Sequence, residues 1–214
     1  MYQLISPWEK LTKKELLEKS LESTMEMTRF MKTEMCKDRK GNADLNPFLV
    51  FGLEITDEDG DERLGGAVIE MDLEKGENPV EMLPKMLSDI HEQGMEKFIW
   101  VMFVCEGYAE TDPEKVKSMA SNDGTYEYGS LEQDFHNNPT STVQEGLIAT
   151  CFAWTGESAV YQQPYKYDDF GVPEYLDKSE TYSEDEMNGR IPNIFARFVK
   201  YSQLAQLSEN NWKE

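Results

Sequence analysis

Hydrophobic and polar residues follow one another along this chain in blocks whose lengths and periods predict most of its secondary structure. The uncharged run Phe98–Cys105 comes shortly after Gly94 and is rich in β-branched and aromatic side chains. This composition and length favour a strand buried on both faces over a turn of helix. The polarity changes at Glu106, so we expect a carboxylate at the end of this central strand.

A first long helix is predicted from Thr12, which forms a capping-box pattern with Glu15 three residues later. Apolar and small residues recur at helical spacing as far as Lys40 and Gly41, at Leu17, Leu21, Met25, Thr28, Met31 and Met35. The spacing predicts about 24 helical residues. Methionine adapts to irregular surfaces, so the stripe fits either a core-facing surface or a partner-binding groove.

The segments 48–55 and 64–73 are apolar, flank the acidic residues 57–62 and predict a β-hairpin. Asn78 and Pro79 then have the order of a helix cap and first turn, and predict a second helix over 79–93. Because that helix leads into the strand 98–105, we expect a right-handed crossover that places the last strand centrally.

The C-terminal half alternates between polar segments and strands. Residues 121–141 are rich in Gly, Asn, Asp and Ser and predict a long loop, whereas 143–154 and 158–165 predict two antiparallel strands. Residues 167–189 form an acidic, turn-rich segment. A last helix starts at Pro192 and has an apolar face made by Ile194, Phe195, Phe198, Val199 and Tyr201.

Together these elements predict a single α+β domain over residues 1–214. We expect a mixed, mainly antiparallel sheet of about five strands, with three long helices packed on it in the order α-β-β-α-β-β-β-α. Trp100, Val101 and Phe103 should be buried in its middle.

Charge is the feature of the composition that bears most on function. The chain has 42 acidic and 21 basic residues and a formal charge of -21. This excludes a phosphate-backbone binder, because such proteins bind through Lys and Arg. The acidity fits ordinary solubility, a surface that meets a basic partner, or imitation of a polyanion.

The three cysteines, Cys36, Cys105 and Cys151, show no paired spacing, which indicates neither a disulfide framework nor a zinc site. No apolar segment approaches the length of a membrane span, and the first eight residues do not have the pattern of a secretory signal. We therefore expect a cytoplasmic protein, in the host cytoplasm if it is viral, with no membrane association and no cofactor.

No nucleotide-binding, nucleophile-elbow or metalloprotease motif is present. Asp57, Asp59 and Asp61 resemble the start of a calcium loop, but Glu62 and Val68 stand where that loop needs glycine and glutamate. A nucleophilic Cys105 or Cys151 would need His91 or His136 as its base, and an inert buried thiol is the alternative.

Glu106 and Glu145 are the most promising pair of ionisable residues. The first ends the central strand and the second begins the strand 144–151, so antiparallel pairing would put both at one end of the sheet. Two carboxylates there could hold a divalent metal or perform acid–base chemistry. They could equally lie in water or pair with Arg190 or Arg197.

The segments around these glutamates carry a family resemblance. Phe103–Tyr108 and, about forty residues later, Val143–Ala149 resemble two short motifs of small uncharacterised bacteriophage and bacterial proteins. Those proteins have Phe-Val-Ser-Glu-Ala-Trp and a later Glu-Ala-Leu, where this chain has Cys, Gly and Tyr in the first motif and Gly in the second. The resemblance implies an α+β fold and a viral origin, but no activity.

We therefore expect a non-enzymatic, acidic accessory protein that binds a basic protein partner, as an inhibitor or polyanion mimic. A metal-assisted hydrolase using Glu106 and Glu145, and a structural virion component, are the alternatives. The predicted partner-binding residues are thirteen acids in two segments: Asp57, Glu58, Asp59, Asp61 and Glu62, and Asp168, Asp169, Glu174, Asp177, Glu180, Glu184, Asp185 and Glu186.

Overall fold

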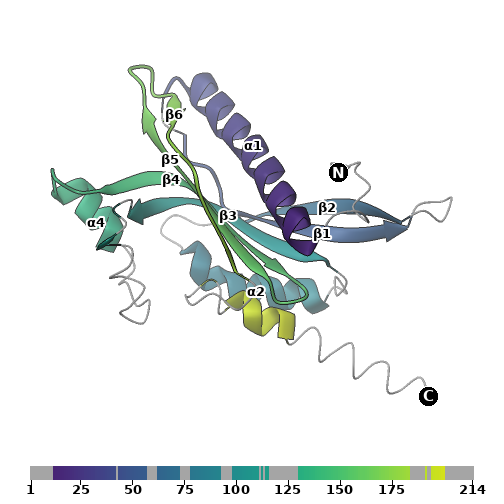
Figure 1. The fold of residues 1–214 in the computed structure, drawn as a ribbon. Helices are drawn as coiled ribbons and strands as arrows, with labels where there is room; N and C mark the ends of the chain where they lie inside the picture. The colour runs from purple at the N-terminus through teal and green to yellow at the C-terminus, as the bar shows by residue number, and fades with distance from the viewer. Residues whose placement is uncertain are drawn as a thin grey trace, which may run out of the picture.

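A computed structural model describes residues 12–41, 43–56, 62–72, 78–92, 98–110, 112, 114–115, 130–183, 191 and 194–200. One antiparallel sheet is covered on one face by a long helix and on the other by two shorter helical segments (Figure 1). The α+β fold class is therefore confirmed. The helices are α1 (Lys13–Arg39), α2 (Pro79–Glu92) and α4 (Ser130–Asn137), and residues 194–200 are also helical.

The described sheet has seven strands: β1 (Phe48–Thr56), β2 (Glu62–Glu70), β3 (Trp100–Glu110), β4 (Val143–Ala153), β5 (Ser158–Tyr167), β6 (Pro173–Tyr175) and β7 (Ser179–Ser183). Their order is β2-β1-β3-β4-β5-β6, and β7 also pairs with β5. The strand β3 is central, as predicted. The expected mainly antiparallel sheet is confirmed, and every described pair is antiparallel. The described sheet has seven strands rather than about five, and α4 adds a helix to the three expected. Strands β2 and β3 run in the same direction, but β1 lies between them.

Helix α1 begins as its capping box predicts. The Thr12 hydroxyl accepts the Glu15 amide at 3.2 Å, and the Glu15 carboxylate accepts the Thr12 amide at 2.8 Å. The helix ends at Arg39, and the left-handed backbone of Lys40 (φ 53°) lets the next amide, that of Gly41, donate to the Cys36 carbonyl at 3.1 Å. The cap of α2 is also confirmed, since Asn78 accepts the Val80 amide at 2.9 Å.

The alternation of β3 builds two apolar cores, one on each face of the sheet. Trp100, Met102 and Val104 face α1, and the intervening Val101 and Phe103 face α2 and the helical residues 194–200. The residues predicted to be central are therefore buried. On the α2 side the packing residues include Leu83, Leu87, Ile90, Phe195 and Phe198.

Three predicted segments differ from the structure. The predicted loop 121–141 contains α4, a two-turn helix too short to show a clear period, which packs against β3 and β4. The predicted acidic segment 167–189 contains β6 and β7, which form because they pair with the edge of β5. Strand β3 continues to Glu110, since β4 pairs with it over its whole length, so Glu106 lies inside the strand.

Replacing Gly52 by alanine should destabilise the protein. Gly52 pairs with Trp100 across β1 and β3, and a Cβ there would overlap the buried indole ring. Such overpacking costs about 1 to 3 kcal/mol of unfolding free energy, measurable by urea denaturation. Gly66 in β2 pairs with Gly52 on its other side and is the matched control, because its added Cβ would meet its nearest atom at 3.7 Å. Equal midpoints for Gly52→Ala and Gly66→Ala would contradict this packing.

Candidate functional site

The pairing of β3 with β4 brings Glu106 and Glu145 onto one face of the sheet. Glu106 lies opposite Leu147, and Glu145 is two residues further along the same face. The antiparallel pairing predicted for these strands is confirmed, and the two carboxylates do converge. The face on which they lie is the one that α1 covers, since Val104 and Leu147 belong to the core beneath that helix.

The C-terminal half of α1 places a lysine directly over this position. The Lys32 side chain is fully buried, and its ammonium group forms an ion pair with Glu106. It also donates a hydrogen bond of 2.6 Å to the Ala43 carbonyl. Burying a lone ammonium is very costly, so these partners are what make its position tolerable.

Tyrosines complete the surroundings of Lys32. Its Nζ lies 5.4 Å from the centre of the Tyr165 ring and 5.5 Å from that of Tyr167, within the range of cation–π attraction. We call Lys32, Glu106, Glu145, Tyr165 and Tyr167 the α1 polar cluster. Its members come from α1, β3, β4 and β5, so the cluster ties the helix to three strands.

Glu106 receives donors on both of its oxygens. The Leu45 amide donates to Oε2 at 2.6 Å, while Lys32 and the Tyr165 hydroxyl, at 2.7 Å, approach Oε1. The same Tyr165 hydroxyl lies 2.8 Å from Oε1 of Glu145. A hydroxyl has a single hydrogen, so it can donate to only one of the two carboxylates at a time.

Burial and neighbouring charge shift the pKa values of this cluster in defined directions. Burial alone would lower the pKa of Lys32, but the hydrogen bonds and charges of Glu106 and Tyr167 more than offset it, so the pKa is raised. Burial, and then the charge of Glu106, also raises the pKa of Tyr165. The lysine therefore stays charged and the tyrosine neutral at physiological pH.

A second group of rings lies at the rim of this face, on β3 and α4. Tyr108 contacts Phe135 and His136, with ring centroids 5.2 and 5.9 Å away, and its hydroxyl lies 3.4 Å from His136 Nε2. Burial, followed by the charges of Glu145, Glu132 and Asp44, raises the pKa of Tyr108 to about 12. The surroundings of this half-buried tyrosine are therefore acidic.

The geometry bears directly on the enzymatic alternatives. Glu106 is the counter-ion of Lys32, so its charge is balanced without Arg197, and Arg190 lies outside the described residues. Among the residues that the structure describes, no group of three His, Cys, Asp or Glu side chains could hold a metal ion. Burial raises the pKa of Cys151, and with the charge of Glu106 it raises the pKa of Cys105 to about 12, so both thiols stay protonated.

The predicted partner-binding acids are only partly described. Asp168 and Asp169 lie in the β5–β6 turn, Glu174 in β6, Asp177 after it and Glu180 in β7, while Glu62 begins β2. Asp57, Glu58, Asp59, Asp61, Glu184, Asp185 and Glu186 lie outside the described residues.

The strands that flank the first acidic segment and the β5–β6 turn of the second lie at different ends of the sheet. Strands β1 and β2 extend past the start of β3, where Gly52 pairs with Trp100, whereas Asp168 follows β5 towards the other end of β3. Figure 1 shows the β1–β2 hairpin and the β5–β6 turn pointing in different directions. Further along the second acidic segment, β7 pairs with the start of β5 and so lies towards the end of the sheet from which β1 and β2 extend.

The sequence did not single out Lys32 or the tyrosines of the α1 polar cluster. A signal for Lys32 was present, because it lies four residues after Thr28 and four before Cys36, both buried on the same stripe. Met31 and Met35, which were assigned to that stripe, are only partly buried beside it. Tyr165 and Tyr167 carried a weaker signal, the alternation of β5.

Replacing Lys32 by methionine should destabilise the fold strongly. The change leaves the Glu106 carboxylate partly buried without its cation, which costs about 3 to 5 kcal/mol of unfolding free energy. Urea denaturation of the variant measures this loss. The control is Lys37→Met, because Lys37 pairs with Glu34 on the exposed surface of the same helix, 2.8 Å away. A similar loss in both variants would refute the role of Lys32, and adding Glu106→Gln to Lys32→Met should cost less than the sum of the single changes.

Replacing Tyr165 by phenylalanine should flatten the alkaline part of the stability profile. Above about pH 10 tyrosine ionises in the unfolded chain, whereas the raised pKa keeps Tyr165 neutral in the fold, so stability falls as the pH rises. Removing that group should reduce the slope by about 1.4 kcal/mol per pH unit, measured by urea denaturation between about pH 9 and 12. Parallel profiles for the variant and the wild type in that range would show that Tyr165 is not held neutral.

Comparison of the chain with protein-family models, with curated proteins and with solved structures found no match in any of the three. No described helix is long and apolar enough to cross a membrane. The geometry and charge of the chain's own residues are therefore the basis for proposing a function.

Proposed function

We propose that this protein acts by binding another protein that presents a basic surface, and that it is not an enzyme. The observation that carries the proposal is the formal charge of -21 on 214 residues. A charge of this size produces a long-range field that attracts basic surfaces and speeds their association.

The pairing of the groups of the α1 polar cluster with one another supports a binding role over catalysis. Its lysine is fully buried and paired, and its two carboxylates share the hydroxyl of Tyr165. These groups bind one another rather than a substrate. The metal-assisted hydrolase built on Glu106 and Glu145 is therefore the weaker candidate, since a metal would have to compete with the ammonium group of Lys32 for Glu106.

A role as an accessory protein of bacteriophage type fits the acidic surface and the short motifs around Glu106 and Glu145. Among such roles, inhibition of a host protein by direct binding is favoured over imitation of a polyanion. A mimic needs carboxylates spaced like phosphates along one ridge. The start of the second acidic segment, at Asp168, instead points away from the β1–β2 hairpin.

Association with the partner should slow steeply as salt is added. The partner would first be captured from a host lysate, identified and purified. The rate at which it associates with this protein would then be measured between about 50 and 500 mM salt, where the Debye length falls from roughly 14 to 4 Å. Neutralising Glu174 and Asp177 together, both exposed, should slow association, whereas Lys166→Gln on the same hairpin should speed it. A rate insensitive to salt and to these changes would reject the proposal.

A further inference from the structure

Phe170 is the most exposed large apolar side chain among the described residues. It lies in the turn between β5 and β6 and is 79% exposed, ahead of Phe30 on α1 at 66%. Isolated exposed apolar residues are common on protein surfaces, so exposure alone does not indicate a binding site. What distinguishes Phe170 is the rigidity of the element that carries it.

The turn around Phe170 is fixed by four hydrogen bonds. The Asp168 side chain accepts the amides of Phe170 and Val172 at 2.9 and 2.8 Å. The Asp168 amide donates to the Val172 carbonyl at 2.9 Å, and the Gly171 amide donates to the Asp168 carbonyl at 3.0 Å. Gly171 has a φ of 75°, which suits glycine, so the sequence Asp-Asp-Phe-Gly specifies this turn locally.

The hairpin behind the turn is attached to α1. The Tyr175 hydroxyl donates to the Arg29 carbonyl at 3.0 Å and lies 3.5 Å from the Thr33 hydroxyl. Arg29 in turn donates to the Gln163 side chain at 3.0 Å. Since Tyr165 belongs to the α1 polar cluster, the base of the hairpin is held by two neighbouring sets of contacts.

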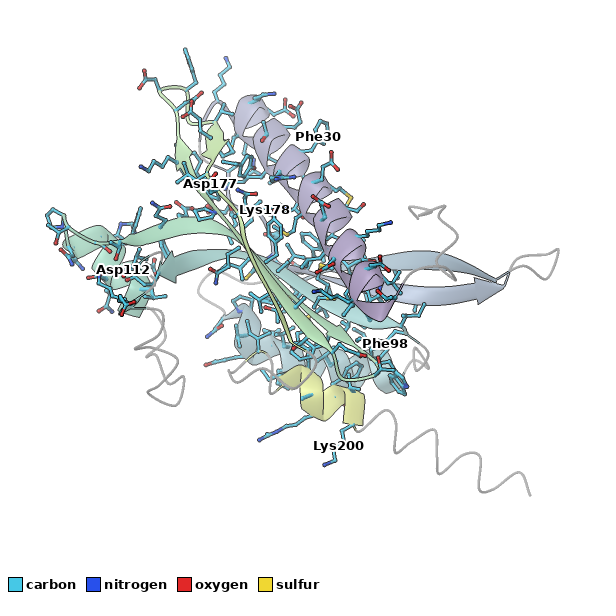
Figure 2. The ribbon with its side chains drawn as sticks, viewed as in Figure 1. Phe30, Phe98, Asp112, Asp177, Lys178 and Lys200 are labelled. Carbon is cyan, nitrogen blue, oxygen red and sulfur yellow. The ribbon has the colours of Figure 1, made fainter. Side chains whose placement is uncertain are left out.

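Such a turn holds the backbone that carries the aromatic ring in one conformation before binding. Binding normally costs free energy to immobilise loops and side chains, and a pre-ordered loop avoids most of that cost. Buried aromatic side chains are also the usual anchors of protein interfaces. Asp169, next to Phe170, and Glu174 in β6 are exposed, and so is Asp177, which follows β6 (Figure 2). The hairpin that carries the ring therefore also carries exposed carboxylates.

We propose that Phe170 is the anchor by which this protein binds its partner, and that the partner is a folded protein with an apolar pocket bordered by Lys or Arg. The ring fills the pocket, and Asp169 pairs with the basic residue at its rim. This proposal rests on the proposed function, because it names the contact point of a protein–protein interaction. It adds a specific site to an attraction that charge alone would leave diffuse.

The proposal can be tested by placing the photo-cross-linking residue benzoylphenylalanine at position 170 of the full chain. After irradiation in host lysate, the cross-linked peptide should map to an apolar pocket with Lys or Arg at its edge. The same residue at position 166, which is exposed in β5 on the same hairpin, is the control for non-specific capture. Equal capture from both positions, or a cross-link to a flat polar surface, would overturn the proposal.

Affinities for the purified partner give the second measurement. Phe170→Ala should weaken binding about thirtyfold or more, as loss of an interface anchor does, and Phe170→Trp should retain most of the affinity. Phe30→Ala, the matched control on α1, should change the affinity less than about threefold. The urea midpoint of Phe170→Ala should equal that of the wild type, because the ring is exposed. A threefold effect or less for Phe170→Ala would overturn the anchor.

The two proposals fail in different ways. If Phe170→Ala binds like the wild type and association still slows with salt, the acidic interaction stands and the anchor is rejected. If Phe170→Ala loses binding but the wild-type rate does not depend on salt, the anchor stands and the electrostatic proposal is rejected.

Discussion

The ion pair between Lys32 and Glu106 is the interaction on which the arrangement of α1 on the sheet depends. An ammonium group that is fully buried must have its charge balanced, and here the balancing groups come from β3, β5 and the connection after α1. Apolar packing from Leu17 to Met25 holds the first half of the helix. In the second half, the charge and hydrogen bonds of Lys32 are added to the packing of Met31 and Met35, so the two halves are stabilised differently.

This division accounts for the tyrosines in β5 and β6. Tyrosine has a ring that can pack against apolar neighbours and a hydroxyl that needs a polar partner. Tyr161, nearer the apolar half, bonds Gln163 at 2.8 Å, while Tyr165 bonds the two glutamates and Tyr175 bonds the helix backbone. These tyrosines line the contact between α1 and the sheet from the apolar core to the α1 polar cluster. Their hydrogen bonds also attach the hairpin that ends in the β5–β6 turn to α1.

Local and periodic signals were sufficient to predict most of the fold. The capping box at Thr12, the period of α1 and the apolar run around Val101 each report an element that a single segment specifies. The predictions failed where long-range pairing decides the outcome, as in β6 and β7, which exist because β5 offers them an edge. The convergence of Glu106 and Glu145 was predictable from antiparallel pairing, but the lysine that pairs with Glu106 was missed because buried lysines are rare.

The buried lysine also fixes which turn of α1 lies over which strand. An apolar stripe can slide along an apolar groove by one helical turn, about 5.4 Å, and still bury similar area. A lysine that must meet a particular carboxylate has no such freedom, as with a polar residue at a core position of a coiled coil. Inserting or deleting a residue between Met25 and Lys32 would rotate one half of α1 by about 100° relative to the other. The length of that segment is therefore set by the geometry of the sheet.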